Sequence, residues 1–372
     1  LNSGGMVSGA IEVSNYLKKK KGQSIIASSG GYREKEVLKN DGISIHLPVD
    51  TKNPFSIYQN KKRLIKIIKK YNVNIIHARS RAPAWSAYWA SRVEKIPFIT
   101  TFHGTYGTEN LLKKKYNSVM VKGDYVIAIS KFIKMHIEKE YNKTDNVFVI
   151  PRGIDEKIFS PEKVTTERII SAAKKIKTDD FKKTILMPGR LTSWKGHEIA
   201  IRALSLIKEH NLKLIILGDL QRRFKYKRYL EKLVFQLGVS NKVTFLEATR
   251  DLPAFMMLAD LVISCSTKPE AFGRTILEAQ AMGRPVLAFN HGGSVELINE
   301  NKNGILSPVL DTNIFAQNIL RSLSLSMKDR KKISKESIKR VNNKYLTSIM
   351  CKKTINLYKN LILKKNEKNF SN

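Results

Sequence analysis

The alternation of short β-branched apolar runs with longer amphipathic stretches constrains the fold of this chain more than any other feature. Such alternation is typical of βαβ units, in which helices connect parallel strands. The pattern runs through the first half of the chain and restarts in the second half. It predicts strands at Ser24–Ser28, Asn74–Ala78, Phe98–Phe102, Tyr125–Ser130, Val147–Pro151, Thr184–Pro188, Leu212–Leu217, Val243–Leu246, Leu261–Ser264 and Pro285–Phe289.

Two α/β domains account for this repetition, because 372 residues are long for one hydrophobic core. The seam falls between Gly153 and Phe181, where a strand gives way to a polar, lysine-rich stretch. We expect an N-terminal domain at residues 1–155, a C-terminal domain at 156–344, and a last segment at 345–372. The helix of that segment, at Tyr345–Asn360, is expected to pack back on the first domain. Two doubly wound domains would face each other across a cleft, because open α/β sheets bind ligands at the carboxyl ends of their strands.

The net charge of +35 is the outlier of the composition. Such a field attracts phosphates of nucleic acids, anionic lipids or phosphorylated sugars. The alternative is a lysine-rich proteome in which lysines only cover solvated faces. No apolar stretch is long enough to span a bilayer. The two cysteines, Cys265 and Cys351, form no disulfide or zinc framework, which fits a reducing cytoplasm.

The segment Lys268–Val286 carries the strongest functional signal. It places Glu270 in the loop before a helix and Glu278 inside that helix. Both carboxylates can then point into one cleft, one toward a sugar ring and the other toward a ribose. Gly273 allows close backbone approach, and the helix that follows offers free N–H groups to a ligand. The alternative is a pair of solvated helical glutamates.

A second signal is a glycine-containing loop after the predicted strand Thr184–Pro188, which carries Arg190 and Lys195. An arginine offers a planar fork for phosphate oxygens, and a lysine offers a compact point charge. Together they can neutralise a diphosphate leaving group without a metal. The alternative is two surface cations beside a loop.

Two further clusters lie in the first half of the chain. Gly4 and Gly5 precede an amphipathic helix, and their backbone N–H groups fit a loop that approaches phosphate. The strand that ought to precede this loop is missing, so the sequence is expected to begin just after it. His103 follows the predicted strand Phe98–Phe102, at the strand end where such sheets hold ligands. A buried or surface histidine without a function is the alternative.

Taken together, these clusters resemble glycosyltransferase family 4, whose members adopt the GT-B fold of two Rossmann-like domains. The resemblance extends from Gly4 and Gly5 to the terminal helix, and the glutamate pair is its most specific part. Val149–Asp155 resembles the interdomain segment of the family, although this chain has Arg152 where Asn is common. Within the family, the pattern is most similar to lipopolysaccharide-core-type enzymes of α-proteobacteria.

The resemblance implies a retaining, metal-independent glycosyltransferase with a UDP- or GDP-sugar donor and no cofactor or metal. Arg190 and Lys195 would hold the donor diphosphate, Glu278 the ribose, and Glu270 the donor sugar, while His103 would lie beside the anomeric centre. The implied catalytic residues are His103, Arg190, Lys195 and Glu270. The implied donor-binding residues are Gly5, Arg190, Lys195, Glu270, Phe272, Gly273, Arg274, Thr275 and Glu278.

Arg79 and Arg81 follow a predicted strand on the acceptor side, and they would suit an acceptor with carboxylate or phosphate groups. Inner-core lipopolysaccharide is such an acceptor. The alternative is that both arginines pair locally. Basic and apolar residues in the helix that contains Lys61–Lys70 and in Leu111–Tyr116 could hold a cytoplasmic enzyme peripherally on an anionic inner membrane. An ordinary helix with a lysine-rich solvent face explains them equally well.

Two rival functions remain open at this stage. A GT-B enzyme that glycosylates a small soluble acceptor would have the same fold and another acceptor domain. A basic, non-enzymatic nucleic-acid-binding protein would explain the charge. The sequence, however, contains no recognisable RNA- or DNA-reading motif.

Overall fold

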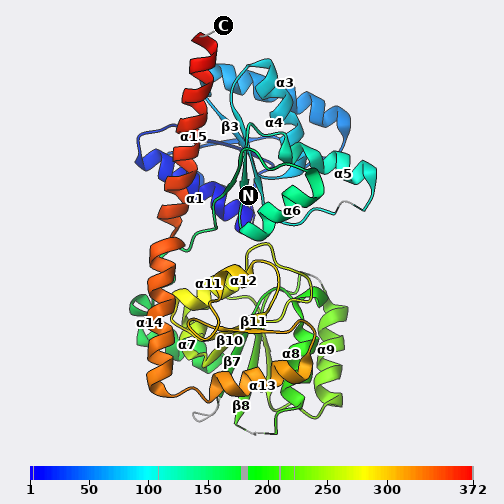
Figure 1. Cartoon of the computed structure of the whole chain (residues 1–372), viewed down its shortest axis with the longest axis vertical. Helices are drawn as coiled ribbons and strands as arrows, with labels where there is room; N and C mark the ends of the chain where they lie inside the picture. The colour runs from blue at the N-terminus through cyan, green and yellow to red at the C-terminus, as the bar shows by residue number, and fades with distance from the viewer. Residues whose placement is uncertain (3, 108, 177–182, 209–210, 222, 371–372) are drawn as a thin grey trace. The chain divides into compact units, whose positions relative to one another are not determined.

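The structure of the chain is a computed structural model that describes residues 1–2, 4–107, 109–176, 183–208, 211–221 and 223–370. The chain divides into two compact units (Figure 1). Unit 1 contains Leu1–Gly153 and Thr347–Asn372, and unit 2 contains Ile154–Leu346. In the described part of the chain, no helix combines the length and apolar character needed to cross a bilayer.

Unit 1 contains two parallel sheets with helices around them. One sheet pairs β1 with β2, and the other has the strand order β3-β4-β5-β6. β4 and β5 are buried along their whole length, as expected for central strands of a covered parallel sheet. The strands are β1 (Ile25–Ser28), β2 (Ile43–His46), β3 (Ile76–Ala78), β4 (Phe98–Phe102), β5 (Tyr125–Ala128) and β6 (Val147–Val149). The helices are α1 (Gly5–Lys19), α2 (Glu34–Leu38), α3 (Pro54–Lys70), α4 (Arg81–Val93), α5 (Leu111–Asn117), η1 (Ser118–Val121), α6 (Lys131–Tyr141) and α15 (Thr347–Phe370).

The terminal helix α15 belongs to unit 1, although the whole of unit 2 lies between it and the rest of that unit in the sequence. Its apolar residues Met350, Ile355 and Tyr358 are buried in one core with Val13 of α1. The Tyr358 hydroxyl also lies 2.5 Å from His77 Nδ1, just beyond the start of β3. Burial of this apolar face stabilises the helix far more than its lysine-rich composition would suggest.

Unit 2 is built on one parallel sheet with the strand order β12-β11-β10-β7-β8-β9. Helices flank this sheet (Figure 1). The strands are β7 (Lys183–Pro188), β8 (Leu212–Leu217), β9 (Val243–Leu246), β10 (Leu261–Ser264), β11 (Val286–Phe289) and β12 (Ile305–Ser307). The helices are η2 (Pro161–Lys163), α7 (Thr166–Ile176), η3 (Ser193–Lys195), α8 (His197–Ser205), α9 (Phe224–Gln236), α10 (Leu252–Leu258), α11 (Arg274–Ala281), α12 (Ser294–Leu297), α13 (Thr312–Leu323) and α14 (Met327–Lys344).

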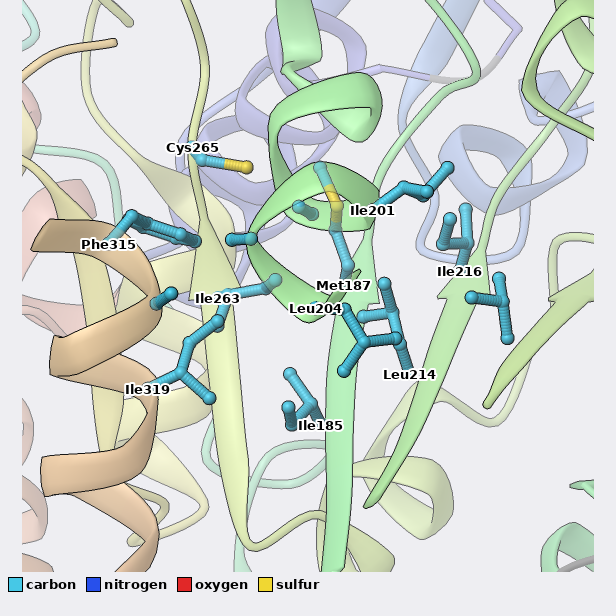
Figure 2. Packing of buried hydrophobic residues seen from close by; sticks show 14 of the residues in the cluster. Ile185, Met187, Ile201, Leu204, Leu214, Ile216, Ile263, Cys265, Phe315 and Ile319 are labelled. Carbon is cyan, nitrogen blue, oxygen red and sulfur yellow. The ribbon is translucent and has the colours of Figure 1, made fainter. Parts of the chain in front are cut away.

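The core of unit 2 holds these strands in register. Ile185, Leu214 and Ile263, from three different strands, lie fully buried in one apolar cluster (Figure 2). Ile201 and Leu204 of α8 and Phe315 and Ile319 of α13 complete the cluster from the helices. Because this core fixes the middle of β7 and β10, it also fixes where the loops at their carboxyl ends begin.

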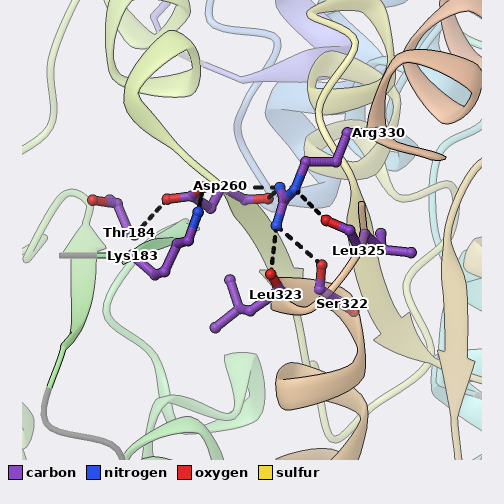
Figure 3. A network of polar contacts seen from close by, with 7 residues as sticks. All are labelled: Lys183, Thr184, Asp260, Ser322, Leu323, Leu325 and Arg330. Carbon is purple, nitrogen blue, oxygen red and sulfur yellow. Dashed lines mark hydrogen bonds and ion pairs between the residues drawn. The ribbon is translucent and has the colours of Figure 1, made fainter. Parts of the chain in front are cut away.

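A polar network anchors the amino ends of the same two strands (Figure 3). Asp260, just before β10, accepts a hydrogen bond from the backbone N–H of Thr184 at 2.9 Å and pairs with Lys183 at 3.2 Å. Arg330 of α14 donates to the backbone carbonyl of Asp260 at 2.9 Å. This network lies at the edge of the sheet opposite the carboxyl-end loops, so it serves the fold.

All ten predicted strands are present, with ends shifted by at most two residues. The sequence analysis missed β2 and β12, and it read α7 as lysine-rich linker. Residues 177–182 of that expected linker lie outside the described residues. The buried face of α7 is narrow, consisting of Ala172 and Ile176, and its lysines obscured the helical spacing. The last expected helix, Tyr345–Asn360, is α15, which starts at Thr347 and continues to Phe370.

Candidate active site

The candidate site of unit 2 lies on the loops that follow β7 and β10. The chain proceeds from β7 to β8 on one side and later returns to β10 on the other side of β7, so the strand order reverses between β7 and β10. Open α/β sheets bind ligands at such a switch point, outside the carboxyl ends of the strands. The β7 loop carries Arg190 and Lys195, and the β10 loop carries Glu270.

Glycine at position 196 allows these two loops to touch. Its φ is +79°, and a Cβ atom there would lie 1.9 Å from the backbone oxygen of Cys265. The backbone N–H of Thr267 donates to the carbonyl of Trp194 at 2.7 Å, which ties the loops together at a second point. Lys195, between these two contacts, is therefore held against the β10 loop.

Lys195 and Glu270 form an ion pair across the two loops. The ammonium of Lys195 lies 2.6 Å from Oε1 of Glu270, and both side chains are mostly buried. The hydroxyl of Ser266 donates to the same carboxylate oxygen at 2.5 Å. Hydrogen bonds to a charged group are stronger than those between neutral groups, so this cluster is well ordered before any ligand arrives.

Glu278 makes a second acid–base pair nearby, within α11. It accepts a hydrogen bond from Arg274 Nε at 2.7 Å, and its side chain is buried. Burial raises the pKa of Glu278, while the charges of Arg274 and Lys195 oppose that increase. A buried carboxylate gains more free energy from an additional hydrogen-bond donor than a solvated carboxylate does.

The amino end of α11 adds backbone donors to this region. Gly273, at φ +91°, precedes the helix, and no side chain caps the first turn. The N–H groups around Arg274 and Thr275 are therefore suited to an anion or a hydroxyl. Phe272 is buried and faces the Tyr345 ring at a centroid distance of 6.3 Å. It therefore supports the loop as well as lining it.

Arg190 is the least constrained of the predicted donor-side residues. It is exposed, and in the described part of the chain its side chain has no hydrogen bond or ion pair. A long cation that is free to move can still reach a phosphate in solvent. The structure thus forms two pairs by direct contact, Lys195 with Glu270 and Arg274 with Glu278, and the charge of Lys195 also acts on Glu278. Arg190 stands exposed on the β7 loop.

Ser266, His291 and Gly293 were not among the predicted site residues. The backbone N–H of Gly293 donates to the carbonyl of Glu270 at 2.7 Å. His291 Nε2 lies 2.7 Å from the carbonyl of Ser266, so Nε2 carries the proton, because a carbonyl only accepts. The two adjacent glycines after His291 were the available sequence signal. With Ser264, Ile276, Phe289 and Ser294, the residues Ser266, Glu270 and His291 enclose a cavity of about 10 Å³, too small for a sugar.

The candidate residues of unit 1 cluster around His103, just after β4. His103 Nε2 is buried and has no hydrogen-bond partner among the described residues. Burial lowers the pKa of His103 well below its usual value, and the charges of Arg152 and Arg79 lower it further. The imidazole is therefore neutral at neutral pH.

Arg79 and Arg81 lie in different surroundings, although they are two residues apart. Arg79 Nη2 lies 3.5 Å from His77 Nδ1, in the neighbourhood of His103. Arg81 donates to the side chain of Asn117 at 3.0 Å, and its guanidinium lies 4.6 Å from the centroid of the Tyr106 ring. Both arginines thus have local partners, and neither forms an ion pair with an acid among the described residues.

Arg152, which follows β6, forms a hydrogen bond with Gly5, the first residue of α1. The buried guanidinium of Arg152 donates to the Gly5 carbonyl at 2.6 Å and lies 3.6 Å from Glu12. A Cβ at position 9 would lie 1.7 Å from Arg152 Nη1, so Gly9 makes room for this side chain. Arg152, a departure from the family pattern, is therefore built into the start of α1.

Comparison with known proteins assigns the chain to a family. Residues 3–157 match the family described as "Glycosyltransferase Family 4", and residues 169–340 match the family described as "Glycosyl transferases group 1". The chain is 30% identical over 359 residues to an uncharacterized glycosyltransferase of Methanocaldococcus jannaschii, which covers 91% of this chain and 90% of that relative. The chain therefore belongs to glycosyltransferase family 4, a family of retaining, metal-independent enzymes that use nucleotide-sugar donors.

Solved structures confirm the GT-B fold. A glycosyltransferase from Rickettsia africae ESF-5 is 39% identical, with a TM-score of 0.91 over 97% of both chains. Anabaena HepE in complex with UDP-glucose is 21% identical, with a TM-score of 0.81 over 94% of both chains. The lipopolysaccharide outer core galactosyltransferase WaaB is 17% identical, with a TM-score of 0.73 over 97% of this chain and 96% of that one. The last two similarities concern the fold alone.

Proposed function

We propose that this glycosyltransferase transfers a sugar from a UDP- or GDP-sugar to a lipopolysaccharide-core or related cell-envelope glycan. The observation that carries the donor half of the proposal is the cluster of Lys195, Glu270 and Ser266 at the switch point of unit 2, with Glu278 nearby. UDP-glucose bound to the structurally similar HepE supports a nucleotide-sugar of this kind.

In the proposed reaction, the bond between the anomeric carbon and the diphosphate oxygen breaks with oxocarbenium-like character. Lys195 and Arg190 stabilise the negative charge that develops on the departing diphosphate. Glu278 accepts hydrogen bonds from the ribose hydroxyls, and Glu270 accepts one from the transferred sugar. The acceptor oxygen forms the new bond to the anomeric carbon, and its proton leaves with the diphosphate.

The same proposal gives His103 and Gly5 of unit 1 roles beside the donor. The neutral imidazole of His103 can exchange hydrogen bonds with a sugar hydroxyl without adding positive charge next to an oxocarbenium-like centre. The uncapped start of α1, at Gly5, offers backbone donors to phosphate oxygens. These roles follow the family pattern residue by residue.

The acceptor side of the proposal rests on Arg79 and Arg81. Each is partly exposed and is paired only with neutral groups by hydrogen bonds. An acceptor that carries phosphate or carboxylate would neutralise the positive charge of both guanidinium groups. The structural similarity to WaaB, an outer core galactosyltransferase, supports an envelope glycan over a small soluble acceptor.

A peripheral contact with an anionic, cytoplasmic membrane surface extends this proposal. Leu111 and Leu112, at the start of α5, are 84% and 78% exposed, and three lysines follow them directly. An exposed apolar pair beside a basic run favours adsorption to anionic lipid. Sedimentation with phosphatidylglycerol vesicles tests it, and a protein that stays in the supernatant would contradict it.

The first experiment measures the melting temperature with UDP, GDP, ADP and their sugar conjugates, each with EDTA present. A ligand that binds only the native state raises the midpoint by mass action. We expect one nucleoside diphosphate and its sugar conjugate to raise the melting temperature of the wild type. They should do the same in the charge-matched control Lys232→Ala, which changes an exposed lysine of α9. We expect no such increase in Lys195→Ala.

Two other outcomes would contradict the proposal. An unchanged response of Lys195→Ala would remove Lys195 from the donor site. A wild type whose melting temperature rises with RNA or DNA but with no nucleotide would also contradict it. The net charge would then predict the ligand better than the cluster at the switch point does.

A further inference from the structure

We propose that Ser266 is a positioning residue that holds Glu270 ready for the transferred sugar when Lys195 turns to the diphosphate. This inference rests on the proposed donor site and adds a residue to it. It follows from the way in which two donors share one oxygen of the Glu270 carboxylate.

The two donors of Glu270 converge on one of its oxygens. Lys195 Nζ and Ser266 Oγ both lie against Oε1, at 2.6 Å and 2.5 Å. Oε2 makes no hydrogen bond to any residue that the structure describes. One oxygen of the carboxylate is therefore used to fix its orientation, and the other remains available to a hydroxyl.

Ser266 is itself held firmly enough to orient another side chain. It is only 3% exposed. Its carbonyl accepts the hydrogen bond from His291, and the carbonyl of Glu270 accepts one from Gly293. Both residues are thus fixed through their backbones by the same short loop, so the distance between Ser266 Oγ and Glu270 Oε1 varies little.

The two donors differ in what a diphosphate does to them. The Lys195 ammonium is a cation, and a nearby diphosphate competes with Glu270 for it. The Ser266 hydroxyl is neutral, buried and already donates to Glu270, so a diphosphate competes for it less than for the ammonium. When the donor binds, Ser266 remains as the hydrogen bond that keeps Glu270 in place.

A direct role for Ser266 in contact with the substrate does not fit its surroundings. The cavity beside it has a volume of about 10 Å³, roughly the size of one water molecule. A sugar ring cannot enter, so the hydroxyl acts through Glu270.

Calorimetric titration with a nucleoside diphosphate and with its sugar conjugate tests this role. The probes are UDP with UDP-glucose and GDP with GDP-mannose, and the pair that binds the wild type is used. We expect Ser266→Ala to leave the Kd of the nucleoside diphosphate within twofold and to raise the Kd of the sugar conjugate about tenfold. A merely structural role would weaken both ligands together.

Matched variants isolate the path through Glu270. Ser322→Ala removes an equally buried hydroxyl, which donates to the carbonyl of Asn318 within α13 and not to Glu270, and should change neither Kd. In a Glu270→Ala background, Ser266→Ala should add less than a twofold effect, because its partner is gone. Ser266→Cys, nearly isosteric and a weaker donor, should show the same selective loss and replaces Ser266→Ala if that variant fails to fold.

The outcomes separate this inference from the proposed function. A wild type that binds no nucleoside diphosphate overturns the proposed function. A wild type that binds both ligands, with Ser266 variants that weaken both equally or neither, overturns the role of Ser266 and leaves the donor site standing.

Discussion

The two strand-end regions of this enzyme, one in each unit, differ in how their buried polar groups are balanced against nearby cations. In unit 2, Glu270 and Glu278 each have a cation at hydrogen-bond distance, Lys195 and Arg274 respectively. In unit 1, Arg79 and Arg152 lie near His103, which burial and these cations keep neutral. Both regions follow parallel strands at the edge where such sheets bind ligands.

The difference shows what each region can do when a ligand arrives. A paired cluster can exchange partners, because an incoming anion can compete for Lys195 while Ser266 keeps a hydrogen bond to the carboxylate of Glu270. A neutral histidine beside cations resists protonation and remains available as a hydrogen-bonding group. Unit 2 is therefore suited to a charged diphosphate, and the His103 region to an uncharged part of a sugar.

The largest effect should come from breaking the pair in unit 2. Lys195→Met leaves Glu270 ionised beside the site of the diphosphate, and we expect the affinity for the nucleotide-sugar to fall about 100-fold. In the double variant Lys195→Met/Glu270→Gln, the repelling charge is gone as well. Its affinity should recover by about tenfold, as measured by calorimetric titration. A double variant no better than the single one would show that the pair is not the relevant unit.

A smaller effect should follow from removing the charge of Glu278, which is buried. Because its pKa is raised in the folded protein, the folded state binds more protons than the unfolded state between the two pKa values. Stability attributable to this group therefore increases as pH falls through the folded-state pKa. Glu278→Gln should stabilise the free protein by about 1 kcal/mol at neutral pH, and it should lower nucleotide affinity about tenfold.

Urea unfolding at several pH values checks this opposition between stability and binding. The stability gain of Glu278→Gln should shrink as the pH is lowered. The control Glu198→Gln, at a partly exposed carboxylate paired with Arg202, should change stability by less than about 0.5 kcal/mol. A Glu278→Gln variant that is less stable than the wild type at neutral pH would mean that the pair with Arg274 outweighs the cost of burial.

Local patterns in the sequence placed the predicted donor-side residues on the right loops and helix, but did not predict their partners, and the donor-side role stays a prediction. Lys195, Glu270 and Glu278 stand in loops and a helix start that strand runs and glycines mark in the sequence. Ser266 contacts Glu270 four positions along a loop that has no regular period, and Arg152 contacts Gly5 across 147 positions. Contacts of that kind depend on tertiary packing, which no short-range period records. β2 and β12 were missed because neither is a continuous apolar run: Ser44 and His46 interrupt β2, and β12 has only two apolar residues before Ser307.

The smallest expected effect concerns unit 1, where Arg152 acts on the pKa of His103. Burial is the main cause of the lowered pKa of His103, and Arg152 is the larger of the two charge contributions. Arg152→Met removes one cation and leaves the burial, so the pKa of His103 should rise and still stay below its usual value. The shift of the His103 Cε1 proton, followed by NMR against pH, measures it.

Gly9→Ala offers an independent route to the same test. The added methyl would overlap the Arg152 guanidinium and push it from its place against α1 without removing its charge. If distance from His103 matters, this variant should also raise the pKa of His103, by less than Arg152→Met does. An unchanged pKa in both variants would mean that burial alone keeps His103 neutral. The contrast between the two regions would then lie in packing and not in the placement of charges.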